Sequence, residues 1–123
     1  MLAILAQGDP PTAVFCANDE MAIGAMKAAR ERGMTLPRDL SLVGFDDIGF
    51  AAYSTPALST VSQPREEIGA QSMRLMLAIL QQRRPDQCRV VLQHTLVLRE
   101  STAKPRHLRS PASRAGLHPG GGT

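Results

Sequence analysis

Short apolar runs alternate along this chain with longer segments of helical periodicity. The run Thr12–Ala17 predicts a strand buried on both faces, and Asn18 directly after it is a typical N-cap residue. Apolar residues at helical spacing then predict a helix over 19–32, which Gly33 ends. A second buried strand is predicted over Leu40–Phe45. Strand, helix and strand of these lengths form a βαβ unit, in which the two strands are parallel.

The same alternation continues to about residue 100. Five further elements are predicted, namely the last turns of a helix over 2–6, a turn or short helix over 48–54, a strand over 58–63, a long helix over 64–82 and one or two strands within 90–98. The predicted fold class is therefore α/β, with a parallel sheet and flanking helices.

Charge and small residues set the end of the chain apart. The net charge is +3, but residues 101–123 carry four basic residues and no acid, together with many Pro, Gly and Ser residues. We expect residues 1–100 to form the folded part and residues 101–123 to form a basic, flexible tail. A basic tail can attract nucleic acid, yet aromatic residues make up only 3% of the chain, so a base-stacking surface is absent.

The cysteines and the N-terminal residues bear on the compartment. Cys16 lies in an apolar run and Cys88 precedes another, so both are interpreted as small buried hydrophobes rather than as a disulfide. The apolar run at residues 1–6 lacks a basic flank and is too short for a signal sequence or a membrane span. A cytoplasmic protein with no membrane partner is therefore expected.

Candidate ligand-binding residues follow the first two predicted strands. Asn18 comes after one strand and Asp46 after the other, and ligands of parallel sheets gather beyond the carboxyl ends of the strands. A carboxylate and an amide together suit the hydroxyl groups of a sugar or another polyol. Plain capping by Asn18 and a solvated strand end at Asp46 and Asp47 are the competing interpretations. A metal at the two aspartates would need further ligands, which the neighbouring sequence lacks.

Signatures of catalysis and of cofactor binding are missing. The chain has no Gly-x-Ser-x-Gly motif and no Gly-rich phosphate loop after a strand. His94, His107 and His118 all lie outside the candidate site region, so we interpret them as solvated or packed side chains. The sequence therefore predicts neither an enzyme nor a cofactor.

Several motifs, taken together, resemble the lactose/purine repressor (LacI/GalR) family of bacterial transcription regulators. They occur in the order and approximate spacing of that family and cover about residues 9–102. The motifs are Pro11–Met26 (PTAVFCANDEMAIGAM), residues 33–37 (GMTLP), Asp39–Asp47 (DLSLVGFDD), Tyr53–Pro64 (YSTPALSTVSQP) and Leu98–Thr102 (LREST).

The resemblance implies a fold and a set of functional residues. The fold would be part of a type I periplasmic-binding-protein-like fold, with residues 1–100 forming the C-terminal part of the effector-binding and dimerisation core and including pieces of both lobes. Asn18 and Asp46 correspond to effector contacts, and Gln63 to a crossover position near the effector in some members. Ile23 and Tyr53 correspond to positions at the dimer interface. Arg65 stands where some members have an aromatic ring, so stacking on a sugar is not expected from that position.

The same resemblance implies the partners of the intact protein. They would be a sugar-like small-molecule effector, a second copy of the chain, and operator DNA bound through a helix-turn-helix headpiece that is absent from this sequence. The alternative is a periplasmic sugar-binding protein of an ABC transporter, which shares the motifs around Asn18 and Asp46. The segments 58–64 and 99–102 favour the regulator. A nucleotide-using α/β enzyme would need a Gly-rich first turn, which the chain lacks.

Overall fold

The computed structural model describes residues 1–81 and 89–105 and contains one four-stranded sheet. The strand order is β1-β2-β3-β4, with β1 at Ala13–Phe15, β2 at Ser41–Phe45, β3 at Ser59–Ser62 and β4 at Thr95–Val97. β1, β2 and β3 are parallel, as predicted, whereas β4 pairs antiparallel with β3. The sheet is therefore mixed. Residues 90–92 are not a strand, so only one strand forms at the end of the folded part.

In the part of the chain that the structure describes, four helices connect or flank these strands. They are α1 at Leu2–Leu5, α2 at Asp19–Glu31, α3 at Gly49–Tyr53 and α4 at Arg65–Leu80. The signals in the sequence set the limits of α2, since the side chain of Asn18 caps its first turn and Gly33 follows it with a φ of 72°. The predicted helices over 19–32 and 64–82 are thus confirmed to within about two residues, the usual uncertainty of a helix end.

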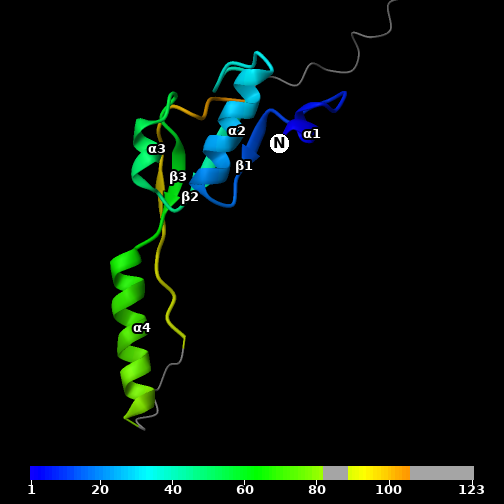
Figure 1. The fold of residues 1–123 in the computed structure, drawn as a ribbon. Coiled ribbons are helices and arrows are strands. Elements are labelled where there is room, and N and C mark those ends of the chain that lie inside the picture. Colours follow the sequence, from blue (N-terminus) through cyan, green and yellow to red (C-terminus); the bar gives the residue numbers. More distant parts are fainter. Residues whose placement is uncertain (82–88, 106–123) are drawn as a thin grey trace, which may run out of the picture.

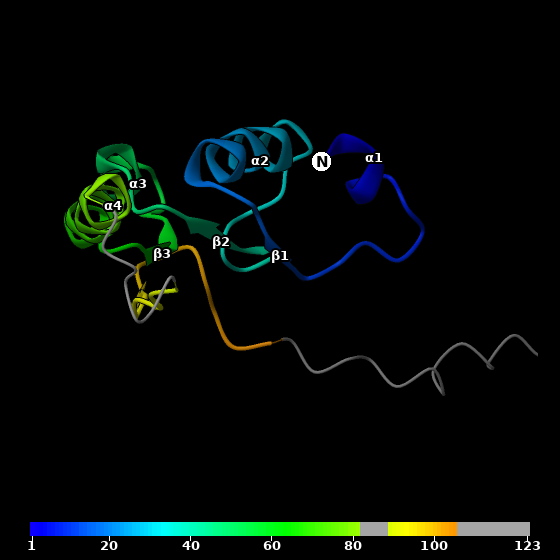
Figure 2. The ribbon, with the colours of Figure 1, turned by 90° about the horizontal axis from the view of Figure 1, so that it is seen from below.

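The core lies between α2 and one face of the sheet. α2 covers this face near β1 and β2, and α1 lies beside α2 (Figure 2). Small side chains of α2, including Ala22, Ala25 and Ala29, are buried against Leu42 and Leu58. Because alanine is short, the helix approaches the sheet closely without large side chains between them.

The opposite face of the sheet is open, contrary to the prediction for the first strand. Phe15 in β1 is 63% exposed, and Val43 beside it in β2 is only half-buried. Among the described residues, helices cover one face of these strands, whereas the segments 37–39 and 102–105 border the other face. The segment after β4 crosses below the strands in Figure 2. The apolar sequence of β1 fits a strand with two covered faces, but this chain supplies one layer.

α4 lies away from the other helices and contributes little to the hydrophobic core. It extends beyond the end of the sheet, with the segment that leads into β4 beside it (Figure 1). None of its residues is buried, and Met73, Ile79 and Leu80 are each at least 59% exposed. The apolar pattern of α4 therefore predicted a helix correctly, but the surface that would cover its apolar side chains is not found in the described residues.

The segment after β4 returns to the sheet and is anchored there. Ser101 is fully buried, its hydroxyl donates to the carbonyl of Leu42 at 2.6 Å, and it accepts from the amide of Ser59 at 2.8 Å. The packed part of the chain therefore continues past residue 100, where the sequence suggests a boundary. The tail itself stays a prediction, because residues 106–123 lie outside the described part.

Three minor expectations concern the cysteines, the histidines and the membrane. Cys16 is buried, as predicted, and burial raises the pKa of its thiol above the ordinary value of 9.0. The ring of His94 lies 5.7 Å from that of Phe45, centroid to centroid. Cys88, His107 and His118 lie outside the described residues. Within the described part of the chain, no helix has the length and apolar character needed to cross a membrane.

Candidate functional site

The three predicted effector contacts follow three neighbouring parallel strands. Asn18 comes after β1, Asp46 directly after β2 and Gln63 directly after β3. The register pairs Phe15 with Val43 and Phe45 with Val61, so all three strands end at the same edge of the sheet. The structure therefore brings these residues to one edge, the place where ligands of parallel sheets bind.

Asp46 and Gln63 are in direct contact. The amide nitrogen Nε2 of Gln63 donates a hydrogen bond to Oδ1 of Asp46, and both residues are half-buried. The main chain joins the same segments, because the amide of Asp46 donates to the carbonyl of Val61 at 2.9 Å. The second carboxylate oxygen of Asp46 has no hydrogen bond to the described residues. The pair thus offers acceptor capacity for hydroxyl groups.

Asn18 has a clear structural role at the start of α2. Its φ of −151° is extended backbone, and its Oδ1 accepts a hydrogen bond from the amide of Met21 at 2.8 Å. Capping, the competing interpretation from the sequence, is therefore present. The cap uses the oxygen alone, so the side-chain Nδ2 is without a partner among the described residues. One side chain can both cap the helix and donate to a ligand.

The sequence did not indicate how completely Asp19 is buried. Its exposure is 0%, Oδ2 accepts from the amide of Ile48 at 2.8 Å, and Oδ1 accepts from the hydroxyl of Thr60. The sequence suggested only a first-turn acid that favours the helix dipole. Gly44, which faces Asp19 from β2, could have indicated this burial. An isolated glycine in a strand often marks a close approach of another segment.

Asp47 is held by an arginine from the end of the fold. Its Oδ1 lies 2.7 Å from Nη2 of Arg99, and the two side chains are 23% and 20% exposed. The competing interpretation of Asp47 as a solvated strand end is therefore wrong. The contact also makes Asp47 a poor metal ligand, since a cation would have to displace the guanidinium.

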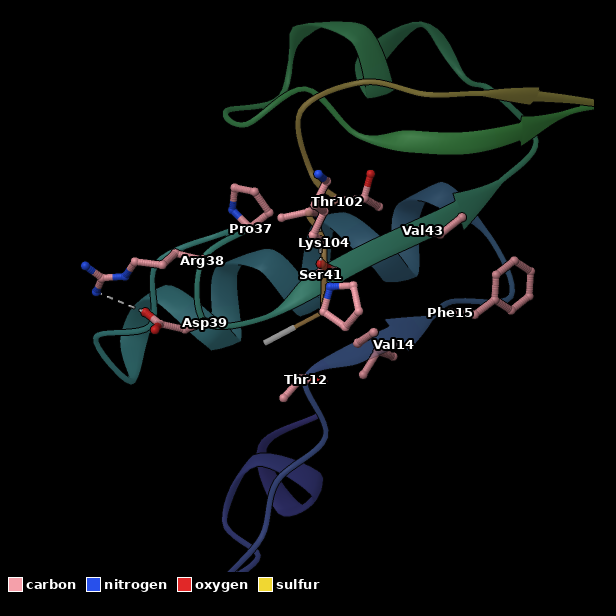
Figure 3. A pocket seen from close by; sticks show the side chains of 13 residues that line it. Thr12, Val14, Phe15, Pro37, Arg38, Asp39, Ser41, Val43, Thr102 and Lys104 are labelled. Carbon is pink, nitrogen blue, oxygen red and sulfur yellow. Dashed lines mark hydrogen bonds and ion pairs between the residues drawn. The ribbon is translucent and has the colours of Figure 1, made fainter. Parts of the chain in front are cut away.

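A shallow, open depression lies beside Gln63 at the start of α4. It measures about 470 Å³ and is lined by residues 63–67, which include Arg65 and two glutamates. A second cavity of about 430 Å³ lies on the open face of the sheet, lined by Thr12, Ser41 and Val43 among others (Figure 3). The second cavity contains none of the predicted effector contacts, so we assign it no part in the candidate site.

The residues predicted at the dimer interface differ in exposure. Tyr53 in α3 is 86% exposed, and Phe50 one turn before it is 75% exposed. Ile23 in α2 is half-buried and packs against the core. Two neighbouring exposed aromatic side chains are unusual on a free surface and are typical of an interface.

Comparison with known proteins defines first the class of domain. Residues 2–102 match the family model of the periplasmic binding protein-like domain. The chain therefore belongs to this family, whose model includes Ser101 and Thr102, the two residues beyond the boundary suggested by the sequence.

Individual relatives then narrow the class. The probable HTH-type transcriptional repressor ExuR of Bacillus subtilis is 51% identical over 80 residues, which are 65% of this chain and 24% of ExuR. A regulatory protein of the LacI family from Chloroflexus aggregans is 44% identical with a TM-score of 0.74, over 83% of this chain and 37% of that one. The lac repressor dimer bound to operator and an anti-inducer is 35% identical with a TM-score of 0.75, over 82% and 35%.

These relatives confirm the resemblance seen in the sequence. The chain is of the lactose/purine repressor (LacI/GalR) type, and the match falls on the periplasmic-binding-protein-like core of such regulators. It spans 24–37% of the length of these relatives. The alternative of a transporter component is not favoured, because the matched relatives are transcription regulators.

Proposed function

We propose that this chain is the C-terminal part of the effector-binding and dimerisation core of a transcription regulator. In this proposal Asp46, Gln63 and Asn18 contact a sugar-like effector. The observation that carries it is the hydrogen bond between Gln63 and Asp46, which fixes a carboxylate at the edge where three parallel strands end. Such a pair binds hydroxyl groups and needs no proton transfer, so the proposed role is sensing rather than catalysis.

Energetics indicate that these three residues are only part of the binding site. Micromolar affinity corresponds to about 8 kcal/mol. Each hydrogen bond to a charged group contributes about 1.5–3 kcal/mol, and neutral ones less. Asp46, Gln63 and Asn18 together fall short of micromolar affinity, so the effector requires further contacts. The depression formed by residues 63–67 beside the pair is open to solvent, so those contacts would come from segments outside the described residues.

The partners of the intact protein follow from the same proposal. The related lac repressor was solved as a dimer bound to operator and an anti-inducer. By analogy, the intact protein forms a homodimer and binds operator DNA through a headpiece outside this chain, which requires a cytoplasmic location. The exposed Tyr53 supports an interface at α3, and Ile23 contributes the part of its side chain that the core leaves uncovered.

Replacement of one carboxylate tests the effector site. The Asp46→Asn substitution, made in the intact polypeptide that contains this chain, removes the charge at nearly constant shape. Operator binding is measured by fluorescence anisotropy while a panel of neutral mono- and disaccharides and purine bases is added. We expect one compound to change operator binding by the unsubstituted protein, and the variant to bind operator normally but to respond at least about tenfold more weakly, the effect of losing one charge-assisted hydrogen bond.

The Glu31→Gln substitution is the matched control. It removes an exposed carboxylate at the end of α2, whose Oε1 lies 4.0 Å from Nζ of Lys27. Its response should equal that of the unsubstituted protein. An Asp46→Asn variant with an unchanged response would refute the assignment of the site.

A further inference from the structure

The turn that carries Asp46 has an unfavourable backbone conformation. Asp46 has a φ of 103° and Asp47 a φ of 52°, both in the left-handed region that residues other than glycine rarely adopt. Two consecutive residues stay in this region only when the surrounding structure holds them there. The direction of the Asp46 carboxylate therefore depends on whatever fixes this turn.

On one side, the turn is held by Arg99. Nη2 of Arg99 lies 2.7 Å from Oδ1 of Asp47, and Nη1 donates to the carbonyl of Leu58 at 2.8 Å. The main chain of Arg99 is fixed separately, because its amide donates to the hydroxyl of Ser59 at 2.9 Å. Loss of the guanidinium would therefore remove one restraint on the turn while the backbone hydrogen bond of residue 99 remains.

On the other side, the turn is held by Asp19. Oδ2 of Asp19 accepts from the amide of Ile48, the residue after Asp47. Asp19 directly follows Asn18, so this contact ties the turn to the start of α2. The turn thus has one side-chain contact toward the helix that carries Asn18 and one toward Arg99, in addition to the main-chain hydrogen bond from the amide of Asp46 to the carbonyl of Val61.

We propose that Arg99 is a positioning residue for the effector site. Through Asp47 it holds the turn in the conformation in which the carboxylate of Asp46 accepts a hydrogen bond from Gln63. Arg99 does not itself contact the effector. This inference concerns the geometry of the Asp46–Gln63 pair and rests on the proposed function only for its biological meaning.

The hydrogen bond of Gln63 reports the position of the turn directly. We would follow hydrogen exchange of the Gln63 side-chain amide by NMR, in the intact polypeptide labelled at glutamine, with the signal assigned from the Gln63→Glu variant. In Arg99→Met, exchange should become faster by about tenfold, as expected when one hydrogen bond to a charged group is lost. The control Arg38→Met removes the guanidinium of another Arg–Asp pair, 3.3 Å apart, and should leave the exchange unchanged.

A double variant separates positioning from general stabilisation. If Arg99 acts through Asp47, Asp47→Asn should also speed the exchange, and Arg99→Met with Asp47→Asn should be no faster than Arg99→Met alone. Additive effects, or unchanged exchange in Arg99→Met, would overturn the proposal. The outcome is independent of the effector, since Asp46→Asn tests the effector site by operator binding. Either proposal can therefore fail while the other stands.

Discussion

Gly44 lies where α2 approaches the sheet most closely, and adding one methyl group there should be severely destabilising. A Cβ atom at this position would overlap Oδ1 of Asp19 and lie 3.1 Å from Cδ2 of Leu58 and 3.2 Å from Cα of Asp19. None of these groups can move freely, because Leu58 is in the core and Asp19 is fully buried with two hydrogen bonds. Gly44→Ala must therefore strain the core or displace the carboxylate.

The magnitude follows from these two routes. Overpacking of a core costs about 1–3 kcal/mol, and a lost hydrogen bond to a buried charged group costs about 1.5–3 kcal/mol. We expect the free energy of unfolding to fall by about 3–5 kcal/mol, since some strain and at least one lost bond combine. This is a large share of the about 5–15 kcal/mol that stabilises an ordinary protein.

The matched control is the same substitution in α2. Gly24 has no atom within 4 Å of an added Cβ and lies on an exposed part of the helix. Gly24→Ala should stabilise by about 0.5–1 kcal/mol, because alanine is the better helix former. Both variants are compared by urea denaturation of the intact polypeptide, with soluble yield as a second measure if Gly44→Ala does not fold. A Gly44→Ala variant within about 0.5 kcal/mol of the unsubstituted protein would refute the reasoning.

Two further predictions concern the anchored C-terminal segment and the open surfaces. Ser101→Ala should lower the free energy of unfolding in urea by about 2–4 kcal/mol, because it leaves the buried amide of Ser59 without its hydrogen-bond partner. The control Ser72→Ala, at an exposed position of α4, should leave the free energy of unfolding unchanged. The 123-residue chain by itself should self-associate at micromolar concentration through Phe15 and the apolar side chains of α4, and Phe15→Ser should weaken this association in sedimentation velocity. A monomeric chain with cooperative thermal unfolding would contradict the second prediction.

Local signals in the sequence predicted most of the secondary structure. Asn18 and Gly33 marked the ends of α2, and Pro64 marked the start of α4, because caps and breakers act on their own neighbours in the chain. The parallel pairing of β1 and β2 also followed from the sequence, since a helix of this length between two strands leaves few other topologies. These features depend on residues close in sequence.

The candidate site was predictable only in part. The positions of Asn18 and Asp46 after adjacent strands placed them at one edge, and the resemblance to the LacI/GalR family added Gln63. The contacts that fix the turn were not predictable, because Arg99 is 52 residues away from Asp47 and Thr60 is 41 residues away from Asp19. No periodicity or spacing connects residues so far apart.

The order of residues alone predicts which segments form helices and strands and which residues follow the strands, because propensity, capping and apolar periodicity are local properties. The folded chain was needed to show that β4 runs antiparallel, that Phe15 and α4 stay exposed, and that the carboxylate of Asp19 is buried. Burial depends on which surface, formed by residues distant in sequence, covers a side chain. An apolar side chain is more stable when it is buried, but its place in the sequence does not show which surface buries it.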